Sequence, residues 1–278
     1  MTVLKKICDT AGGLLQEIVT YSGIFEFEEM ANDIKVVKIK VPSYDATDNF
    51  VHNEDIYTNC KRIDVPATKS EVCNAPILLN GGKATNFIYK VTGIAIEQAQ
   101  KISGVNTIEE IRDILKAIKD FGGFISYTNM ENQLFKHNLI MIDSSMPQII
   151  ANMLLYYYAE DIKECDELVK IIGENDPIEY GDPKLYERKF KKFLCSCALG
   201  MKTAKKWEGM YEDKGGYNIV KSDGAVRVYH VCNRNYFEQY LLNNTIFESP
   251  LINKSEYMNI YEENGQLFIK FNLQIGFK

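Results

Sequence analysis

Carboxylates and lysines are the side chains of this chain that could carry hydrolytic chemistry. The sequence has only three histidines and contains neither a G-x-S-x-G segment nor an H-E-x-x-H segment, so a serine triad and a histidine-built zinc site both lack material. Gly81, Gly82 and Lys83 lack the first glycine of a phosphate-binding loop, and Ala84 replaces the hydroxyl residue that would bind magnesium there. We therefore expect Asp, Glu and Lys side chains to supply any hydrolytic chemistry.

Basic residues gather in one segment of an otherwise acidic chain. The formal net charge is −6, yet residues 184–206 hold eight cations and a single acid, Glu187. The cations are Lys184, Arg188, Lys189, Lys191, Lys192, Lys202, Lys205 and Lys206. This distribution argues against a protein that coats nucleic acid indiscriminately, but it allows a site-specific enzyme whose basic groups are confined to one cleft.

The composition indicates a globular protein of the cytoplasm. With 278 residues, of which 46% are hydrophobic, the chain can bury one large core or two small ones. No apolar stretch of about 18 residues occurs, and MTVLKKICDTAGG lacks the apolar core and cleavage site of a signal peptide. We therefore expect a cytoplasmic location and no membrane partner.

The cysteines are predicted to be reduced thiols. Seven of them are scattered along the chain, and their spacing matches no paired zinc-ligand motif. Cys195 and Cys197 lie two positions apart on a predicted helix, where that spacing points them to different faces. We predict that they pack in the core and do not share a metal ion.

The part of the chain before residue 69 is predicted to form one helix and three strands. A helix is expected to start near Gly13, followed by strands at residues 24–29 and 33–41, where β-branched and aromatic residues alternate with charges. Residues 42–62 lack either period and are predicted to form a long loop, and a further strand is expected at residues 63–68.

The remaining elements follow from periodicity and capping signals. Helices are predicted at residues 107–122, where Thr107 and Glu110 form a capping box, and at 147–158, 164–172 and 184–199. Past Trp207, strands flank turns at residues 222–224 and 264–265, and one short helix is expected at residues 235–242. Strands at both ends around a helical middle predict an α+β fold.

Several segments of the chain, in the same order, resemble the HpaII family of type II restriction endonucleases. They are PILLNGGKATNFIYK from Pro76, NLIMIDSSMPQIIANMLLYYY from Asn138, DPIEY from Asp176, KFKKFLCSCALGM from Lys189, KWEGMYEDKGGYNIVKSDGAVRVYHV from Lys206, NNTIFESP from Asn243 and FIKFNLQI from Phe268. The resemblance runs from residue 69 to residue 278, and the part before it is expected to be shortened or divergent.

The resemblance implies a PD-(D/E)xK-type nuclease with a mixed β-sheet core. It implies one endonuclease domain over residues 1–278, with a divergent catalytic-core part at 1–90, a helical part at 91–210 and a β-rich part with C-terminal hairpins at 211–278. In such nucleases an acid on one strand and an acid-x-lysine on the next hold Mg2+ and activate water. Oxygen ligands hold the hard cation against the scissile phosphate, while the lysine positions the water and stabilises negative charge.

By this resemblance Lys69 matches the catalytic lysine, although Pro66 and Ala67 depart from the family pattern on that strand. The first metal acid has two candidates. Asp55 lies fourteen positions before Lys69, a span that suits two adjacent strands and a turn, whereas Asp33 has the better strand context but lies thirty-six positions away. A third alternative is that neither aspartate binds the metal ion.

Two glutamates are further catalytic candidates. Glu17 resembles the glutamate of the family's first helix, which approaches the metal site, and the alternative is a surface helix acid. Glu71 follows Lys69 by two positions and would share its strand face, so it could serve as a displaced ligand. The chain also looks short between the first helix and the catalytic strand, which suggests that part of the metal-binding half has been deleted.

DNA contacts are expected from two basic regions. Lys189, Lys192, Lys202 and Lys205 would bind phosphates, which supply affinity and register but no sequence choice. A solvated helix face is the alternative interpretation of these lysines. The glycines of KGGYNIVK would let a hairpin approach DNA with three further residues, Lys214, Tyr217 and Arg227, although a tight structural turn explains the glycines equally well.

The C-terminal region departs from the family in residues that could read bases. The family looks richer in arginine and histidine there, whereas this chain has Lys254, Ser255 and Gly276 at those places. Arginine reads guanine with two hydrogen bonds, and its loss would weaken discrimination by roughly 1–3 kcal/mol per base pair. We expect altered or lost specificity, with Lys254 as the remaining contact.

The resemblance therefore implies a type II restriction endonuclease that cuts double-stranded DNA at a short palindrome, CCGG in the family, with Mg2+ as cofactor. It also implies a protecting DNA methyltransferase as partner, and a palindromic target suits a homodimer. The alternative is a catalytically inactive DNA-binding homologue whose metal strand has drifted. A globular interaction protein with no nucleic-acid role is the third hypothesis, and it predicts that Lys189, Lys192 and Lys214 are dispersed over opposite faces.

Overall fold

The computed structural model describes the backbone of residues 51–54, 61–64, 67–70, 77–102, 108–210, 216–220, 226–230, 234–249 and 259–278. Side chains are described for residues 77–102, 111–210, 234–249 and 259–278. The predicted N-terminal helix and the strands predicted at residues 24–29 and 33–41 lie outside these ranges. The chain forms two compact units: the first combines residues 1–76, 198–200 and 211–238, and the second combines residues 77–197, 201–210 and 239–278.

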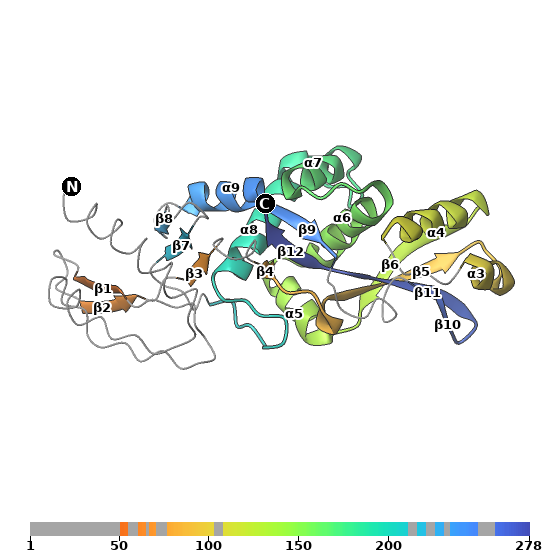
Figure 1. Ribbon diagram of the computed structural model, residues 1–278, viewed down its shortest axis with the longest axis horizontal. Coiled ribbons are helices and arrows are strands. Elements are labelled where there is room, and N and C mark those ends of the chain that lie inside the picture. Colours follow the sequence, from red (N-terminus) through yellow and green to blue (C-terminus); the bar gives the residue numbers. More distant parts are fainter. Residues whose placement is uncertain are drawn as a thin grey trace. The chain divides into compact units, whose positions relative to one another are not determined.

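The described strands of the first unit form two small sheets (Figure 1). β1 (Val51–Glu54) pairs antiparallel with β2 (Lys61–Asp64). β3 (Ala67–Ser70) pairs parallel with β7 (Gly216–Val220), and β7 pairs antiparallel with β8 (Val226–His230). The β3-β7-β8 sheet is therefore mixed, and the β7–β8 hairpin confirms the strands predicted on either side of residues 222–224.

Two predictions for this region are wrong. The single strand predicted at residues 63–68 is divided between β2 and β3, which belong to different sheets. Pro66, which has no N–H to donate to a strand ladder, separates the two in the sequence. The loop predicted at residues 42–62 contains β1, because the pairing of β1 with β2 overrides the weak local pattern of VHNE.

The second unit holds two sheets. The larger has the order β10-β11-β5-β6, with every neighbouring pair antiparallel. Its strands are β5 (Asn86–Thr92), β6 (Phe124–Met130), β10 (Tyr261–Glu263) and β11 (Gln266–Asn272). The smaller has the order β4-β12-β9, formed by β4 (Ile77–Leu79), β9 (Thr245–Glu248) and β12 (Gln274–Phe277). β11 and β12 are separated only by Leu273, so one stretch of chain connects the two sheets.

Most helical residues belong to the second unit, and the residues of α9 are divided between the two units. The bounds of the helices are α3 (Ile96–Ile102), α4 (Ile108–Asp120), α5 (Gln133–Ile142), α6 (Met146–Glu160), α7 (Cys165–Asn175), α8 (Pro183–Ala198) and α9 (Arg234–Asn244), and a 3₁₀ turn covers Lys83–Thr85. α6 is buried along most of its length and contacts α4, α5, α7 and β6, which makes it the central helix of the second unit.

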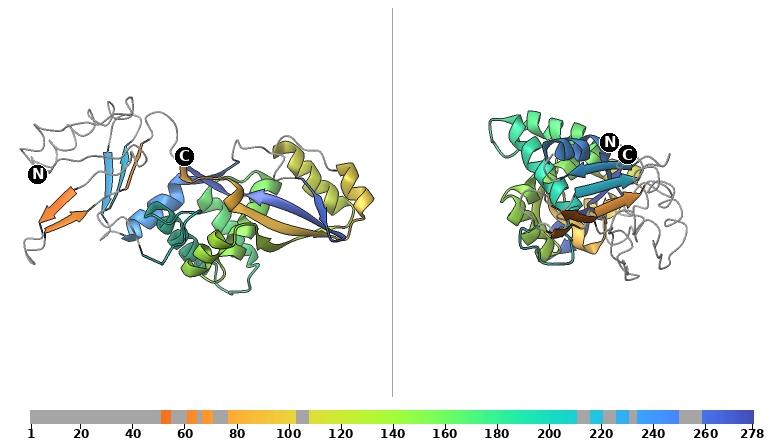
Figure 2. Two further views of the ribbon diagram at one scale, coloured as in Figure 1. Left: turned by 90° about the horizontal axis from the view of Figure 1, so that it is seen from below. Right: turned by 90° about the vertical axis from the view of Figure 1, so that its left-hand side faces the viewer.

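One face of the larger sheet packs against the core. β5 and β11 run side by side in the left view of Figure 2, and Phe87, Tyr89 and Val91 of β5 alternate with less buried residues as a half-buried strand requires. Tyr89 donates a hydrogen bond from its hydroxyl to the carbonyl of Ala151 on α6 at 2.7 Å. Sheet and central helix are thus joined by aromatic packing and by a buried hydrogen bond.

The α+β prediction is confirmed by this mixture of helices and antiparallel sheets. α4, α6, α7, α8 and α9 lie at the predicted segments, and Asn264 and Gly265 adopt positive φ values of 52° and 74° in the predicted turn between β10 and β11. The prediction of a helical middle region was incomplete, because residues 124–130 (FISYTNM) form strand β6. Among the described residues, no single helix is long and apolar enough to cross a membrane. Only α5 and α6 reach that length and apolar character when they are taken together, and the chain bends by 107° between them.

The prediction that Cys195 and Cys197 pack in the core is confirmed. Cys165, Cys195 and Cys197 are buried and form no disulfide. Burial raises the pKa of the Cys165 thiol to about 12, so this group stays protonated at neutral pH. These three residues therefore serve core packing.

Candidate functional site

Lys69 lies in the mixed sheet of the first unit, together with two of the residues predicted to contact DNA. Its register partner on β7 is Ile219, and Ile219 in turn is the register partner of Arg227 on β8. Tyr217 lies two positions before Ile219, in register with Ala67. Neighbouring strands are about 4.8 Å apart, so the Cα atoms of Lys69 and Arg227 are about 10 Å apart. A predicted catalytic residue and a predicted DNA contact, 158 positions apart in the sequence, thus occupy one row of one sheet.

The candidate metal ligands lie outside the described residues. This applies to Asp55, Asp33, Glu17 and Glu71, and also to the DNA candidates Lys214 and Lys254. Asp55 directly follows β1, whose partner is β2, whereas the partner of β3 is β7. The strand before Asp55 and the strand of Lys69 are therefore not direct neighbours. Within the described part of the chain, no three His, Cys, Asp or Glu residues gather to form a metal site.

Lys189, predicted to contact phosphate, is engaged inside the second unit. Its Nζ lies 2.5 Å from Oδ2 of Asp143, and both side chains are mostly buried. The same ammonium lies 4.9 Å from the centre of the Tyr180 ring. Burial acts to lower the pKa of Lys189, but the hydrogen bond and charge of Asp143 outweigh it, and the pKa lies above its ordinary value. The ion pair joins α8 to the end of α5.

The DPIEY segment holds α7 and α8 together beside this ion pair. Asp176 accepts hydrogen bonds from the Tyr186 hydroxyl at 2.7 Å and from the backbone N–H groups of Tyr180 and Gly181 at 2.8 and 2.7 Å. These donors, the Tyr186 hydroxyl first, hold the pKa of Asp176 below its ordinary value. The role of this segment in the described structure is to join two helices.

The other cations of the basic segment divide by exposure. Lys191 is mostly buried and pairs with Glu187 and with Gln239, and Lys192 is half-buried. Lys202 and Lys205, which follow α8, are exposed, and so is their neighbour Lys206. The exposed members, rather than Lys189, have the access that a phosphate contact requires.

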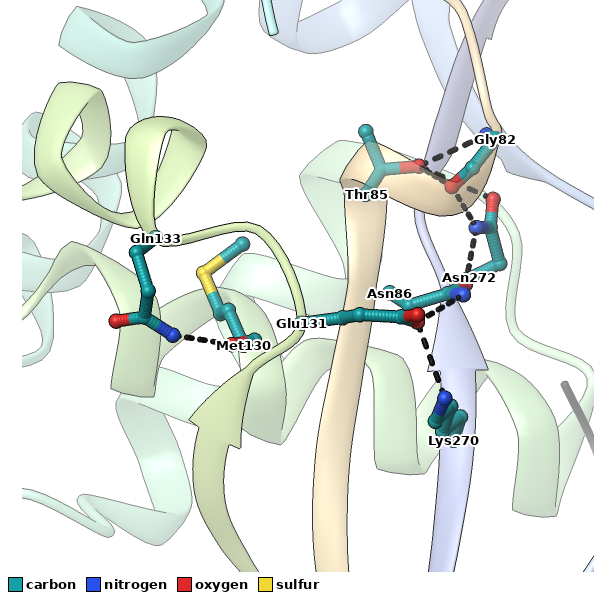
Figure 3. A network of polar contacts seen from close by, with 8 residues as sticks. All are labelled: Gly82, Thr85, Asn86, Met130, Glu131, Gln133, Lys270 and Asn272. Atoms are coloured by element: carbon teal, nitrogen blue, oxygen red, sulfur yellow. Dashed lines mark hydrogen bonds and ion pairs between the residues drawn. The ribbon is translucent and has the colours of Figure 1, made fainter. Parts of the chain in front are cut away.

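A buried polar network organises the loop of the GGKAT segment. Asn272 donates from Nδ2 to the Gly82 carbonyl at 2.6 Å and to Oδ1 of Asn86 at 2.5 Å, and its Oδ1 accepts from the Thr85 hydroxyl at 3.2 Å (Figure 3). Thr85, Asn86 and Asn272 are almost completely buried. Each amide is satisfied by a partner, as burial of polar groups requires. The network therefore gives the GGKAT segment a structural role, namely to fix the loop that precedes β5.

Glu131 closes the network at its outer end. Its Oε2 accepts from Nδ2 of Asn86 at 2.9 Å and from Nζ of Lys270 at 3.2 Å (Figure 3). Burial acts to raise the pKa of Glu131, but these two donors and the charges of Lys270 and Lys83 outweigh it, so the pKa lies below its ordinary value. The carboxylate is the charged anchor of the loop.

Replacing Glu131 by glutamine is expected to make the free energy of unfolding less dependent on acid pH. A lowered folded-state pKa contributes stability that is present above the unfolded value, about 4.3, and is lost as pH falls through the lowered value. The deficit of Glu131→Gln relative to the wild type should therefore be largest at pH 7 and shrink toward pH 3. Urea unfolding at pH 7, 5 and 3 measures it, and a deficit that does not change with pH would contradict the expectation.

Sequence reasoning missed Asn138 of α5. It is fully buried, and its amide binds the main chain of the loop that carries Lys202, Lys205 and Lys206. The signal was a polar residue between Phe135 and Leu139, which occupy the buried face of the same helix. A polar residue at a buried position requires partners, and here the partners are backbone groups of the basic loop.

Comparison with known proteins extends over nearly the whole chain. A family model described as HpaII restriction endonuclease matches residues 5–277. The type II restriction enzyme HpaII of Haemophilus parainfluenzae is 33% identical over 272 residues, which cover 95% of this chain and 75% of that enzyme. No solved structure matches. The similarity thus includes the residues before position 69, for which the sequence segments alone indicated only a divergent part.

Proposed function

The chain belongs to the HpaII restriction endonuclease family, and on that basis we propose that it is a Mg2+-dependent type II deoxyribonuclease of the cytoplasm. Its substrate is double-stranded DNA, and its reaction is hydrolysis of a phosphodiester bond at a short palindrome. The proposed target is CCGG, the site of the family. A DNA methyltransferase that protects this site is the proposed partner, and a homodimer would match the twofold symmetry of the target.

The observation that carries the proposal is the placement of Lys69. It lies on β3 of a mixed sheet, in one row with Arg227 of β8. We assign to Lys69 the positioning of the attacking water and the stabilisation of the negative charge that develops on the phosphate. Arg227 and Tyr217 belong to the adjoining hairpin and are the proposed DNA contacts nearest in the sheet to this lysine.

Carboxylates are the proposed ligands of Mg2+. Oxygen donors suit this hard cation, and Asp55 or Asp33 is the proposed first ligand, with Glu71 and Glu17 as further candidates. When bound, Mg2+ would polarise the scissile phosphate and lower the pKa of a bound water. One feature of the sheet supports a PD-(D/E)xK-type core: the lysine strand β3 pairs in parallel with β7, and β7 pairs antiparallel with β8, so the sheet is mixed.

Phosphate contacts are assigned by exposure. Lys202 and Lys205 are exposed and are the favoured contacts of the second unit, while Lys192 is half-buried. Lys189 could bind a DNA phosphate only if its ion pair with Asp143 were broken. Lys214 and Lys254 complete the proposed set. Such contacts fix the position of the enzyme on DNA but leave the sequence choice to other residues.

The experiment is cleavage of a supercoiled plasmid that contains CCGG sites. With Mg2+ we expect cutting that stops on addition of EDTA and is blocked when the sites are methylated, and a plasmid from which CCGG has been removed serves as the matched control. Cutting of both plasmids at the same positions would overturn the CCGG assignment. Binding to duplex DNA without cutting at any Mg2+ concentration would establish instead the inactive DNA-binding homologue, which the departures at Pro66 and Ala67 favour.

A further inference from the structure

The loop Lys202–Met210, which follows α8, is fixed to α5 by one buried amide. Asn138 donates from Nδ2 to the carbonyl oxygens of Lys202 at 3.0 Å and Lys205 at 2.8 Å. Its Oδ1 accepts from the N–H of Trp207 at 2.9 Å. All three partners are main-chain groups, so Asn138 holds the path of the loop without engaging its side chains. We call this segment the pinned loop.

Three lysine side chains project from the pinned loop. Lys202, Lys205 and Lys206 are all exposed, and Glu208 is the acid of the segment. On the adjoining surface of α5, His137 is exposed, and Lys136 binds Oδ1 of Asn129 through its Nζ. The pinned loop is therefore a cationic surface on a chain whose net charge is −6.

The tip of the pinned loop presents an apolar side chain. The Trp207 indole donates to the carbonyl of Met210 at 2.8 Å, and Trp207 itself is buried. Met210 is 70% exposed, and Met141 and Ile140 of α5 are exposed by 48% and 44%. Gly209, at φ +80°, faces Met141 closely enough that a Cβ would lie 3.8 Å from its Cε. An exposed methionine is thus held on a fixed backbone beside an apolar patch.

Duplex DNA is the partner that matches both properties. Lysines neutralise phosphates, and proteins that bind the minor groove insert exposed apolar side chains between base steps. A hydrophobic protein partner would match Met210, Met141 and Ile140 but would not account for the three exposed lysines of the same loop. The pinned loop is positively charged, whereas the net charge of the whole chain is negative. A positive surface of this kind favours a polyanion such as DNA as its partner.

We infer that the pinned loop is a DNA-docking element in which Lys202, Lys205 and Lys206 bind phosphates, Met210 contacts a groove, and Asn138 is the positioning residue. The inference rests on the proposed function, since it names the surface that holds the substrate. Preorganisation by Asn138 lowers the cost of ordering the loop on DNA. The lysines supply affinity that depends on salt, and the methionine supplies affinity that does not.

The test is fluorescence anisotropy of a labelled duplex in EDTA, which prevents cutting, over a range of salt concentrations. Changing Lys202, Lys205 and Lys206 together to glutamine should reduce the slope of log Kd against log salt by about 3, because each lost phosphate contact removes about 0.9. The control changes Lys116, Lys119 and Lys170, exposed on α4 and α7, to glutamine. It has the same change in net charge and should leave the slope unchanged.

Two further variants separate the parts of the inference. Met210→Ser should weaken binding about tenfold with an unchanged slope, whereas unchanged affinity would overturn the groove contact. Asn138→Leu should reduce the slope while its circular dichroism stays that of the wild type, which a merely structural residue would not produce. If that variant unfolds, the lysine variant decides alone.

The outcomes also distinguish this inference from the proposed function. A wild-type protein that binds no DNA overturns both. A wild-type protein that binds and cuts DNA, with the lysine variant of the pinned loop showing the same slope as the control, overturns the docking element and leaves the nuclease assignment intact. Equal losses of slope in the two lysine variants would also overturn it, because the effect would then reflect total charge.

Discussion

Lys69→Ala is expected to slow DNA cleavage by about 10²–10³-fold, since removal of a group that stabilises developing negative charge has an effect of that size. The loss should appear in the single-turnover rate at saturating enzyme, because the lysine acts on the transition state and not on ground-state binding. The measurement is the conversion of supercoiled plasmid to linear form, with duplex binding recorded in EDTA in parallel.

Lys61→Ala is the matched control for this prediction. Lys61 is a strand lysine of the same unit, but it lies on β2, which pairs with β1 and belongs to a different sheet from β3. The control should cut at close to the wild-type rate. Equal rates for Lys69→Ala and wild type would show that Lys69 is not the catalytic lysine and would remove the residue on which the PD-(D/E)xK assignment depends.

Phe271→Ala is expected to lower the free energy of unfolding of the second unit by about 3–5 kcal/mol, the usual cost of emptying a buried phenylalanine site. Phe271 on β11 is fully buried. Its ring stacks on Tyr158 of α6 at 4.7 Å and lies 4.9 Å from Tyr89 of β5. Both tyrosines are anchored by their hydroxyls, Tyr89 to the Ala151 carbonyl and Tyr158 to the Asn272 carbonyl, so the site cannot collapse easily around a smaller residue.

Urea unfolding followed by circular dichroism measures this effect. Phe124→Ala is the control, because Phe124 on β6 is 73% exposed and its replacement should change the free energy of unfolding by less than about 0.5 kcal/mol. A loss below about 1.5 kcal/mol for Phe271→Ala would contradict the view that the aromatic cluster between α6 and the larger sheet is the main core.

The local elements that the sequence predicted are those with a strong period or a specific turn. The stripe Ile108, Ile111, Leu115 and Ile118 predicted α4, in which Ile111 and Ile118 are buried and Leu115 is half-buried. Asn264 with Gly265 predicted the β10–β11 turn. β6 was missed because it lies in a segment dominated by helices, and its residues become a strand by pairing with β5, more than thirty positions earlier. Pairing between distant segments is not encoded in a local window.

In the candidate site, too, some features could be predicted from the sequence and others only from the tertiary structure. The sequence alone favoured carboxylates and lysines as the side chains for hydrolysis, since it contains neither a G-x-S-x-G nor an H-E-x-x-H segment. Its ordered segments also identified the family. Only the tertiary structure decided which cations are accessible. Lys189 and Lys202 look alike in the sequence, but the first is paired with the mostly buried side chain of Asp143 and the second is exposed on the pinned loop. The physical reason is that a lysine's availability depends on its neighbours in space. The row that joins Lys69 to Arg227 likewise exists only because β3 pairs with a strand about 150 positions later in the chain.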